Sequence, residues 1–230
     1  MKAMILAAGR GERLRPLTDT TPKPLLEVAG EPLIERLIRQ LVEQGFQNLV
    51  INTAWLAELL EQRLGDGRRL GARIRYSREP DGALGTAGGI LQARSLLGDA
   101  PFIVVNGDVW TNFPFSTLRR QPAELAHVVL VDNPKHVPSG DFALQGEQLC
   151  NSGKDMFTFS GVAAYHPNLF DHLAADETAL APLLRATASK GLASGEHFRG
   201  DWFDVGTPQR LLDIEQWMRA KPGAAKPHPT

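Results

Sequence analysis

Short apolar runs alternate with helically spaced apolar positions along the first half of the chain. Residues 4–8 are apolar on both faces, as a buried parallel strand is, and further strands are expected at residues 49–51, 74–77 and 102–105. Between the first two, the i, i+3, i+4, i+7 spacing over residues 33–42 predicts an amphipathic helix. Pro32 suits its first turn and Gly45 its end. Further helices are expected over residues 54–64 and 90–97. This alternation predicts an α/β fold with a doubly wound sheet flanked by helices.

The second half is less regular and predicts antiparallel structure. Strands are expected at residues 128–131, 142–144, 148–150, 156–165 and 202–205. Turns at Gly146 and Gly153 would join the middle three into a small lobe at the edge of the sheet. A last helix is expected over residues 208–219, and a disordered tail rich in Lys, Pro, Gly and Ala over residues 220–230. No hexapeptide period occurs, so no C-terminal β-helix is expected.

Composition favours a single folded unit. At 230 residues the chain can bury one substantial core, so we expect one domain over residues 1–219, with halves of about 1–110 and 111–219. The formal net charge of -1 argues against a general nucleic-acid binder. The single Cys150 excludes an internal disulfide framework and fits a reducing compartment. The first apolar run is too short for a signal peptide, and no run is long enough to span a bilayer. We therefore expect a cytoplasmic monomer or small homo-oligomer without membrane or nucleic-acid partners.

The stretch between the first strand and the first helix is unusually long. A strand-to-helix connection usually takes about 2–6 residues, yet here it reaches about residue 32. Gly9 and Gly11 permit positive φ and a close approach of the backbone to a ligand, and their amides can form an anion-binding nest. Leu14 stands where a dinucleotide fingerprint needs its third glycine, and no Gly-Lys-Ser/Thr follows for a P-loop. On spacing alone, a plain tight turn stays open as an alternative.

Lys23 strengthens the interpretation of this loop as a triphosphate site. Pro22 and Pro24 flank it and reduce the entropy lost when its side chain is held in place. Its ammonium is a compact point charge suited to a phosphate oxygen. Among the neighbouring arginines, we expect Arg13 to face the ligand. The alternative for Lys23 is an exposed lysine between two turn-forming prolines.

Two aspartates far apart in the sequence complete the candidate set. Asp108 follows a buried strand, at the end where open α/β sheets bind ligands, and a turn-stabilising role is its alternative. Asp204 lies among apolar residues, where a carboxylate is costly unless a charge or hydrogen bonds compensate it. Near a phosphate loop, such a pair indicates Mg²⁺, which takes one or two carboxylates plus phosphate oxygens.

The glycine-rich segment at residues 82–89 has two interpretations. Its backbone can wrap around a flat base, or it is a flexible loop in which Thr86 caps the following helix. The six histidines show no metal-ligand spacing, and no Gly-x-Ser-x-Gly motif supplies a serine nucleophile. The expected chemistry therefore rests on the first loop, Lys23 and the two aspartates.

Four motifs occur in order along the chain. They are residues 6–18 with Pro22-Lys23-Pro24-Leu25, then Leu84-Gly85-Thr86-Ala87-Gly88-Gly89, Asn106-Gly107-Asp108, and Trp202-Phe203-Asp204-Val205-Gly206-Thr207. Together they resemble the motifs of the sugar-nucleotide pyrophosphorylases, the nucleotidyltransferases that make NDP-sugars. The resemblance covers residues 2 to about 219 and implies a Rossmann-like, mixed and mostly parallel sheet with a small antiparallel sugar-binding lobe. The short length and residues 157–161 look most like the family's uridylyltransferases of bacterial cell-wall recycling.

The resemblance implies transfer of UMP from UTP to a sugar 1-phosphate, here N-acetylmuramic acid 1-phosphate, with release of pyrophosphate. It implies Arg13 and Lys23 as catalytic residues, and Asp108 and Asp204 as ligands of the cofactor Mg²⁺. The implied nucleotide contacts come from the first loop and the glycine-rich segment: Ala7, Ala8, Gly9, Gly11, Glu12, Arg13, Lys23, Gly82, Gly85 and Thr86. The implied sugar-phosphate contacts are Asn106, Gly140, Asp141 and Lys154.

One departure from the family concerns the anchor of the sugar phosphate. Many relatives carry a Glu-Lys-Pro segment before the Phe-Ser-Gly region; that segment is missing here, and Lys154 is its substitute candidate. Two other functions stay open. One is a thymidylyl- or guanylyltransferase for glucose or mannose 1-phosphate, and the other is a non-catalytic nucleotide-sugar sensor on the same fold. A sensor is expected to lose the lysine or a metal aspartate, and this chain keeps all three. The missing third glycine disfavours a dehydrogenase.

Overall fold

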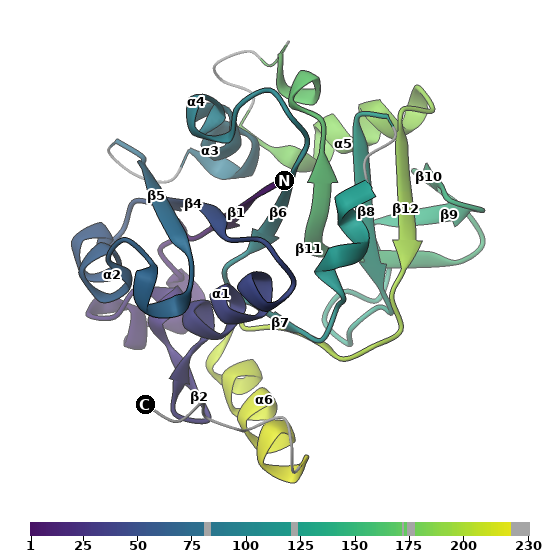
Figure 1. The fold of residues 1–230 in the computed structure, drawn as a ribbon. Coiled ribbons are helices and arrows are strands. Elements are labelled where there is room, and N and C mark those ends of the chain that lie inside the picture. The colour runs from purple at the N-terminus through teal and green to yellow at the C-terminus, as the bar shows by residue number, and fades with distance from the viewer. Residues whose placement is uncertain (81–83, 121–123, 172, 174–177, 222–230) are drawn as a thin grey trace.

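One nine-stranded sheet forms the centre of the computed structural model, which describes residues 1–80, 84–120, 124–171, 173 and 178–221 (Figure 1). Its strand order is β5-β4-β1-β6-β11-β8-β12-β10-β9. These strands are β1 (Lys2–Leu6), β4 (Asn48–Thr53), β5 (Arg73–Arg78), β6 (Phe102–Asn106), β8 (Ala126–Val131), β9 (Phe142–Gln145), β10 (Gln148–Cys150), β11 (Met156–Tyr165) and β12 (Ala193–His197). Two small sheets accompany it: β2 (Glu27–Val28) with β3 (Glu31–Pro32), and β7 (Val109–Thr111) with β13 (Trp202–Asp204).

The sheet is mixed, as expected, but it is less parallel than the sequence predicts. The strands β5, β4, β1 and β6 run parallel to one another. β11 runs antiparallel to its neighbours β6 and β8, and the β9–β10 hairpin is antiparallel as well. β8 and β12 form a further parallel pair. The antiparallel structure predicted for the second half is thus present, but the sheet as a whole is not mostly parallel, because β11 pairs antiparallel with β6, β8 and β9.

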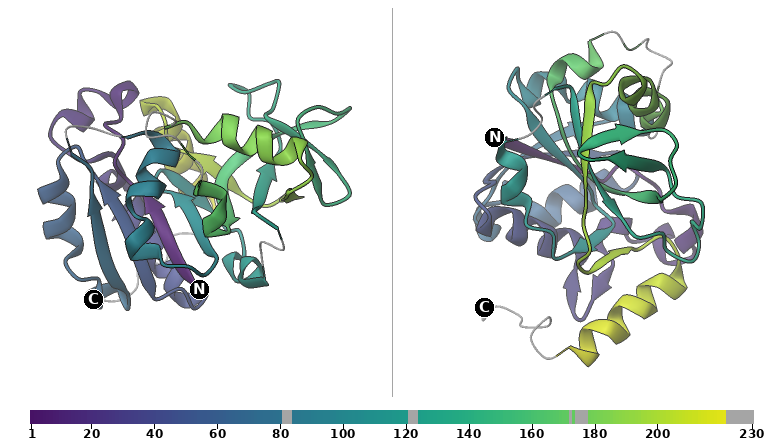
Figure 2. Two further views of the ribbon diagram at one scale, coloured as in Figure 1. Left: turned by 90° about the horizontal axis from the view of Figure 1, so that it is seen from above. Right: turned by 90° about the vertical axis from the view of Figure 1, so that its right-hand side faces the viewer.

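Helices cover both faces of the sheet (Figure 2). They are α1 (Leu33–Glu43), α2 (Ala57–Leu64), α3 (Gly85–Gln92), α4 (Arg94–Leu97), α5 (Leu180–Ser189) and α6 (Pro208–Ala220). Ala3 and Ile5 of β1 pack with α1 and α2 on one face, whereas Met4 packs with α3, α4 and α5 on the other. All three β1 side chains are fully buried. The continuous apolar run in the sequence thus reflects a strand with a helical layer on each side.

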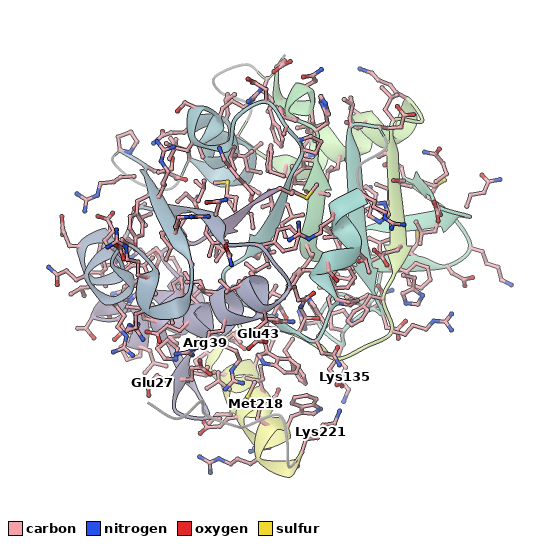
Figure 3. The ribbon with its side chains drawn as sticks, viewed as in Figure 1. Glu27, Arg39, Glu43, Lys135, Met218 and Lys221 are labelled. Atoms are coloured by element: carbon pink, nitrogen blue, oxygen red, sulfur yellow. The ribbon has the colours of Figure 1, made fainter. Side chains whose placement is uncertain are left out.

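α6 packs away from the large sheet, against the β2–β3 hairpin and the start of α1. Ile214 and Met218 of α6 form a separate buried cluster with Val28 and Leu33. Figure 3 labels Met218 on this helix and Lys221 just beyond its end. This contact holds α6 beside the long segment that follows β1.

Several predicted boundaries are corrected by tertiary contacts. β1 ends at Leu6 rather than at residue 8, because the amide of Ala7 donates to the side-chain Oδ1 of Asn52 at 2.8 Å instead of to a backbone carbonyl of the neighbouring strand. The helix expected over residues 90–97 starts earlier, at Gly85, and is divided at Ala93 into α3 and α4. β7, β12 and α5 were not predicted. Residues 222–230 of the expected tail lie outside the described residues. No helix in the described ranges is long and apolar enough to cross a membrane.

Candidate active site

A pocket of about 230 Å³ opens at the carboxyl ends of β1, β4 and β6. Ligands of open α/β sheets bind at this edge. The lining comes from the first loop, the strand ends and the start of α3: Leu6, Ala7, Ala8, Gly9, Lys23, Pro24, Asn52, Glu79, Gly85, Thr86, Asn106 and Asp108. Eight of these twelve residues are among those that the sequence predicts for a site. The fold therefore gathers residues that are far apart along the chain into one cavity.

The loop after β1 is ordered by contacts within itself. It winds through three short 3₁₀ turns. Gly11 has φ 72°, and a Cβ there would lie 2.9 Å from Cγ2 of Thr18 and 3.2 Å from Cβ of Lys23. The hydroxyl of Thr18 donates to the carbonyl oxygen of Gly11 at 2.9 Å. Gly11 thus permits both a left-handed turn and the close approach of Lys23 to the start of the loop.

Lys23 reaches Asp108. Its Nζ forms an ion pair with Oδ2 of Asp108, and the two side chains are only 14% and 25% exposed. Lys23 is therefore not the exposed lysine of the alternative interpretation. Because an ammonium has three N–H donors, Lys23 can hold Asp108 and still face a phosphate oxygen.

Asp204 lies on the segment next to Asp108. The amide of Val205 donates to the carbonyl oxygen of Asp108 at 2.9 Å, so the chain beside Asp204 is fixed against that residue. The Asp204 carboxylate forms an ion pair with Arg210 and lies 3.5 Å from Nε2 of His136. Arg210 thus supplies the compensation that a carboxylate among apolar residues needs.

The expected magnesium site would consist of the two aspartates, with phosphate oxygens and water completing the shell of the ion. Both carboxylates are a quarter exposed and come from adjacent segments beside the phosphate loop. Across the described part of the chain, no group of three or more His, Cys, Asp and Glu side chains could hold a metal. Mg²⁺ needs only one or two protein carboxylates when it binds with a nucleotide. Since Lys23 and Arg210 already face these carboxylates, an ion would compete with two fixed cations.

Asn52 and Glu79 line the pocket without having been predicted. They are 3% and 4% exposed. Oδ1 of Asn52 accepts from the amide of Ala7 at 2.8 Å, and its Nδ2 donates to Oε1 of Glu79 at 2.7 Å. Oε2 of Glu79 accepts from the amide of Leu84 at 2.6 Å. This network joins the ends of β1, β4 and β5 to the start of α3. A polar residue at the end of an apolar strand was the signal that marked Asp108, and it could have marked both.

Gly85 and Thr86 form the first turn of α3. Gly85 has φ 73°, and a Cβ there would lie 2.7 Å from the carbonyl oxygen of Thr178. The same oxygen accepts from the amide of Ala87 at 2.9 Å. A distant segment thus fixes the start of the helix, which local glycine content could not predict. Thr86 lies inside α3, so its interpretation as a cap is wrong. Gly82 lies outside the described residues.

Asn106, Gly140 and Asp141, the expected sugar-phosphate contacts, all lie against β11. A Cβ at Gly161 of β11 would lie 2.5 Å from Nδ2 of Asn106, so this glycine leaves room for the pocket-lining amide. Gly140 packs equally closely on the backbone of β11. Oδ2 of Asp141 accepts from the amide of Phe159 at 2.9 Å. Asp141 therefore shapes the strand, and neither it nor Gly140 lines the pocket.

Lys154 is not brought together with the other predicted residues. It is exposed and lines a second, open hollow with Phe157, His197 and Arg199. No residue of the first pocket lines this hollow. The structure therefore does not place the substitute anchor beside Lys23 and Asp108.

Three residues of the predicted loop lie outside the pocket lining. Gly11 acts through the backbone turn described above. Glu12 is exposed and forms an ion pair with Arg10 at 3.1 Å. Arg13 is also exposed, and its Nη2 would lie 3.2 Å from a Cβ at Gly206, next to Asp204 in the sequence. Arg13 thus faces the segment of Asp204 rather than the pocket itself.

Comparison with known proteins shows the family of the chain. A model of the family described as "Nucleotidyl transferase" matches residues 2–144, more than half of the chain. The chain belongs to this nucleotidyl transferase family. It is 50% identical to the N-acetylmuramate alpha-1-phosphate uridylyltransferase of Neisseria meningitidis serogroup B, over 94% of this chain and 97% of that protein. A protein of the same name from Caulobacter vibrioides is 32% identical, over 93% of this chain and 95% of its own.

Solved structures share the fold. A crystal structure from Bacillus anthracis, described as a candidate glucose-1-phosphate thymidylyltransferase, superposes with a TM-score of 0.84. The match covers 96% of both chains at 22% sequence identity. At this identity the likeness concerns the fold alone, and it confirms the mixed α/β nucleotidyltransferase architecture.

Proposed function

We propose that the protein transfers UMP from UTP to N-acetylmuramic acid α-1-phosphate, giving UDP-N-acetylmuramic acid and pyrophosphate, in cytoplasmic peptidoglycan recycling. The observation that carries the reaction class is the pairing of Lys23 with Asp108 in a pocket that the first loop also lines. The choice of UTP and of this sugar is supported by 50% identity to the Neisseria relative over nearly the whole of both chains.

The proposed reaction asks the protein to position charges. A phosphate oxygen of the sugar 1-phosphate attacks the α-phosphorus of UTP, the bond from that phosphorus to the β-phosphate's bridging oxygen breaks, and pyrophosphate leaves. No bond to the protein forms, so catalysis comes from alignment and from stabilising negative charge. The backbone from Ala7 to Gly11 and the side chain of Arg13 would hold the triphosphate. Lys23, fixed by Asp108, would face the reacting phosphates.

The remaining groups would fix the two substrates around that centre. Mg²⁺ held by Asp108 and Asp204 would neutralise phosphate charge when bound. The backbone of Gly85 and Thr86 would contact the base on the far wall of the pocket. Asn106, which lines the pocket below β11, would contact the sugar side. The buried Asn52–Glu79 network would hold the start of α3, which is proposed to contact the base, in a fixed position relative to the first loop.

Pyrophosphate release from UTP and N-acetylmuramic acid 1-phosphate, with and without Mg²⁺, tests the proposal. We expect Lys23→Ala and Asp108→Asn each to lose at least about 100-fold in kcat, the usual scale for one preorganised charge-stabilising group. Lys190→Ala, at an exposed lysine after α5, is the matched control and should be fully active. Full activity in both Lys23→Ala and Asp108→Asn would refute the proposed catalytic role of this pair.

A panel of sugar phosphates against the four nucleoside triphosphates separates the alternatives. If a hexose 1-phosphate reacts with dTTP or GTP and N-acetylmuramic acid 1-phosphate does not react, the proposed substrates are wrong. The protein would still be a sugar-1-phosphate nucleotidyltransferase. Tight binding of a UDP-sugar without turnover of any pair would favour the sensor.

A further inference from the structure

Arg210 is a buried guanidinium beside the candidate site that the motifs did not single out. It lies in the first turn of α6 and is 17% exposed. Its Nη1 pairs with Oδ2 of Asp204 and donates to Nε2 of His136 at 2.8 Å. Its Nε lies 3.5 Å from the hydroxyl of Thr207. Contacts to two segments, residues 204–207 and His136, thus fix the orientation of the guanidinium plane.

The second terminal nitrogen of Arg210, Nη2, has no hydrogen-bond acceptor among the described residues, although Nη1 has two partners. Nη2 is also the atom that a Cβ at Gly206 would strike first, and Nη2 of Arg13 lies 3.2 Å from the same point. The absence of a side chain at Gly206 therefore lets two guanidinium groups, from the first loop and the last helix, approach each other.

The charges around this point are not balanced. Asp204 pairs with Arg210, and Arg13 has no acidic partner within the described ranges. Arg13 and Arg210 both lie close to Gly206, and only Arg210 is paired with a carboxylate, so positive charge is in excess at this point. Such an excess is stabilised when acceptor oxygens of bound anions face the donors, and a phosphate group matches the guanidinium fork.

We propose that Arg210 binds the phosphate group of the sugar 1-phosphate through its open Nη2. On the proposed function, on which this inference rests, the triphosphate is already served by Lys23, Arg13 and the amides of the first loop. Arg210 instead contacts His136, on the segment that follows β8 and runs towards Gly140 and Asp141. Figure 3 labels Lys135, the neighbour of His136 in the sequence.

Arg210 would thereby take the place that Lys154 cannot. Lys154 lies in the second hollow, whereas Arg210 forms an ion pair with Asp204, one of the two residues proposed to hold Mg²⁺. The anchor of the sugar phosphate would then come from the C-terminal helix, and the packing of α6 on the β2–β3 hairpin would set its position.

Steady-state kinetics of Arg210→Ala and Arg210→Lys test this role, with each substrate varied while the other saturates. Losing one or two charge-assisted hydrogen bonds should raise the KM for the sugar 1-phosphate about 10- to 100-fold in Arg210→Ala. The KM for UTP should change less than about threefold. Arg219→Ala, at an exposed arginine near the far end of α6, is the control and should match the wild type.

Calorimetric binding supplies a readout that does not depend on turnover. We expect Arg210→Ala to bind Mg²⁺–UTP like the wild type but to lose binding of the sugar 1-phosphate in the presence of a non-hydrolysable UTP analogue. Guanidinium ions at millimolar concentration should partly restore that binding.

A raised KM for UTP together with an unchanged KM for the sugar phosphate would assign Arg210 to the triphosphate instead. Wild-type kinetics in a folded Arg210→Ala would overturn any phosphate role, and if that variant does not fold, unchanged kinetics in Arg210→Lys would do so. A wild-type protein that turns over no sugar phosphate would instead refute the proposed function.

Discussion

Replacing Glu79 by Gln exchanges one buried oxygen for an amide nitrogen and leaves the shape of the side chain unchanged. The Glu79 carboxylate accepts from Nδ2 of Asn52 at 2.7 Å and from the amide of Leu84 at 2.6 Å. A glutamine has one acceptor oxygen, so its NH₂ group must face one of these two donors. Rotating the Asn52 amide only transfers the conflict to the amide of Ala7, which now donates to Oδ1 of Asn52.

The cost follows from the burial of this network. Leaving one buried donor unsatisfied costs about 1–3 kcal/mol, and with side chains 3% and 4% exposed, solvent cannot relieve it. For a domain of this size, 1 kcal/mol lowers Tm by roughly 2–4 °C. We expect Glu79→Gln to melt roughly 2–12 °C below the wild type in scanning calorimetry. Glu147→Gln, at an exposed side chain between β9 and β10, should stay within about 2 °C.

Exchanging the carboxylate and the amide between positions 52 and 79 tests whether the hydrogen-bond pattern alone causes the loss of stability. Asn52→Asp alone places two carboxylates face to face and should be destabilising. In the double variant Asn52→Asp/Glu79→Gln, the new aspartate accepts from the amides of Ala7 and of the glutamine, and the glutamine oxygen accepts from Leu84. Every donor again has an acceptor, so the double variant should recover to within about 1 kcal/mol of the wild type. A wild-type Tm for Glu79→Gln, or a double variant below both singles, would refute this reasoning.

Two further predictions concern backbone space and pH. Gly161→Ala puts a Cβ 2.5 Å from Nδ2 of Asn106, whereas Gly146 has a similar positive φ with nothing within 4 Å. Gly161→Ala should therefore lose at least about 1 kcal/mol more stability in urea unfolding than Gly146→Ala, and equal losses would contradict the collision. Burial raises the pKa of Glu35, but hydrogen bonds from Arg69 and Arg63 outweigh it and hold that pKa below its usual value. The resulting stability is present at neutral pH and lost as the pH falls through the lowered value. The Tm deficit of Glu35→Gln should thus be clear at pH 7 and shrink below about pH 4; a pH-independent deficit would point to packing instead.

The fold could be predicted where the signal is local. The helical spacing over residues 33–42 and the apolar run over residues 156–165 gave α1 and β11 almost to the residue. The start of α3 could not be found in this way, because the bond from Ala87 to the carbonyl oxygen of Thr178 overrides a local glycine signal. The end of β1 was likewise decided by a side chain on another strand.

The site could be predicted in its residue types more than in its partners. Glycines, a proline-flanked lysine and aspartates at strand ends marked the pocket, since each type has few local reasons to occur in that setting. Asn52 and Glu79 carry the same strand-end signal and were missed. Arg210 carries no such signal, because an arginine in the first turn of a helix resembles any solvated residue until the neighbouring segments are known.

The sequence by itself determined most of the strands and helices, though not β7, β12 or α5, and it marked the loop that carries Lys23, because periodicity and residue type are properties of neighbouring positions. Tertiary structure decided which charges meet. Strand order placed Lys23 on Asp108, and the packing of α6 placed Arg210 between Asp204 and His136. Ion pairing depends on distances of a few ångströms between segments, and only the arrangement of the whole sheet and its helices sets those distances.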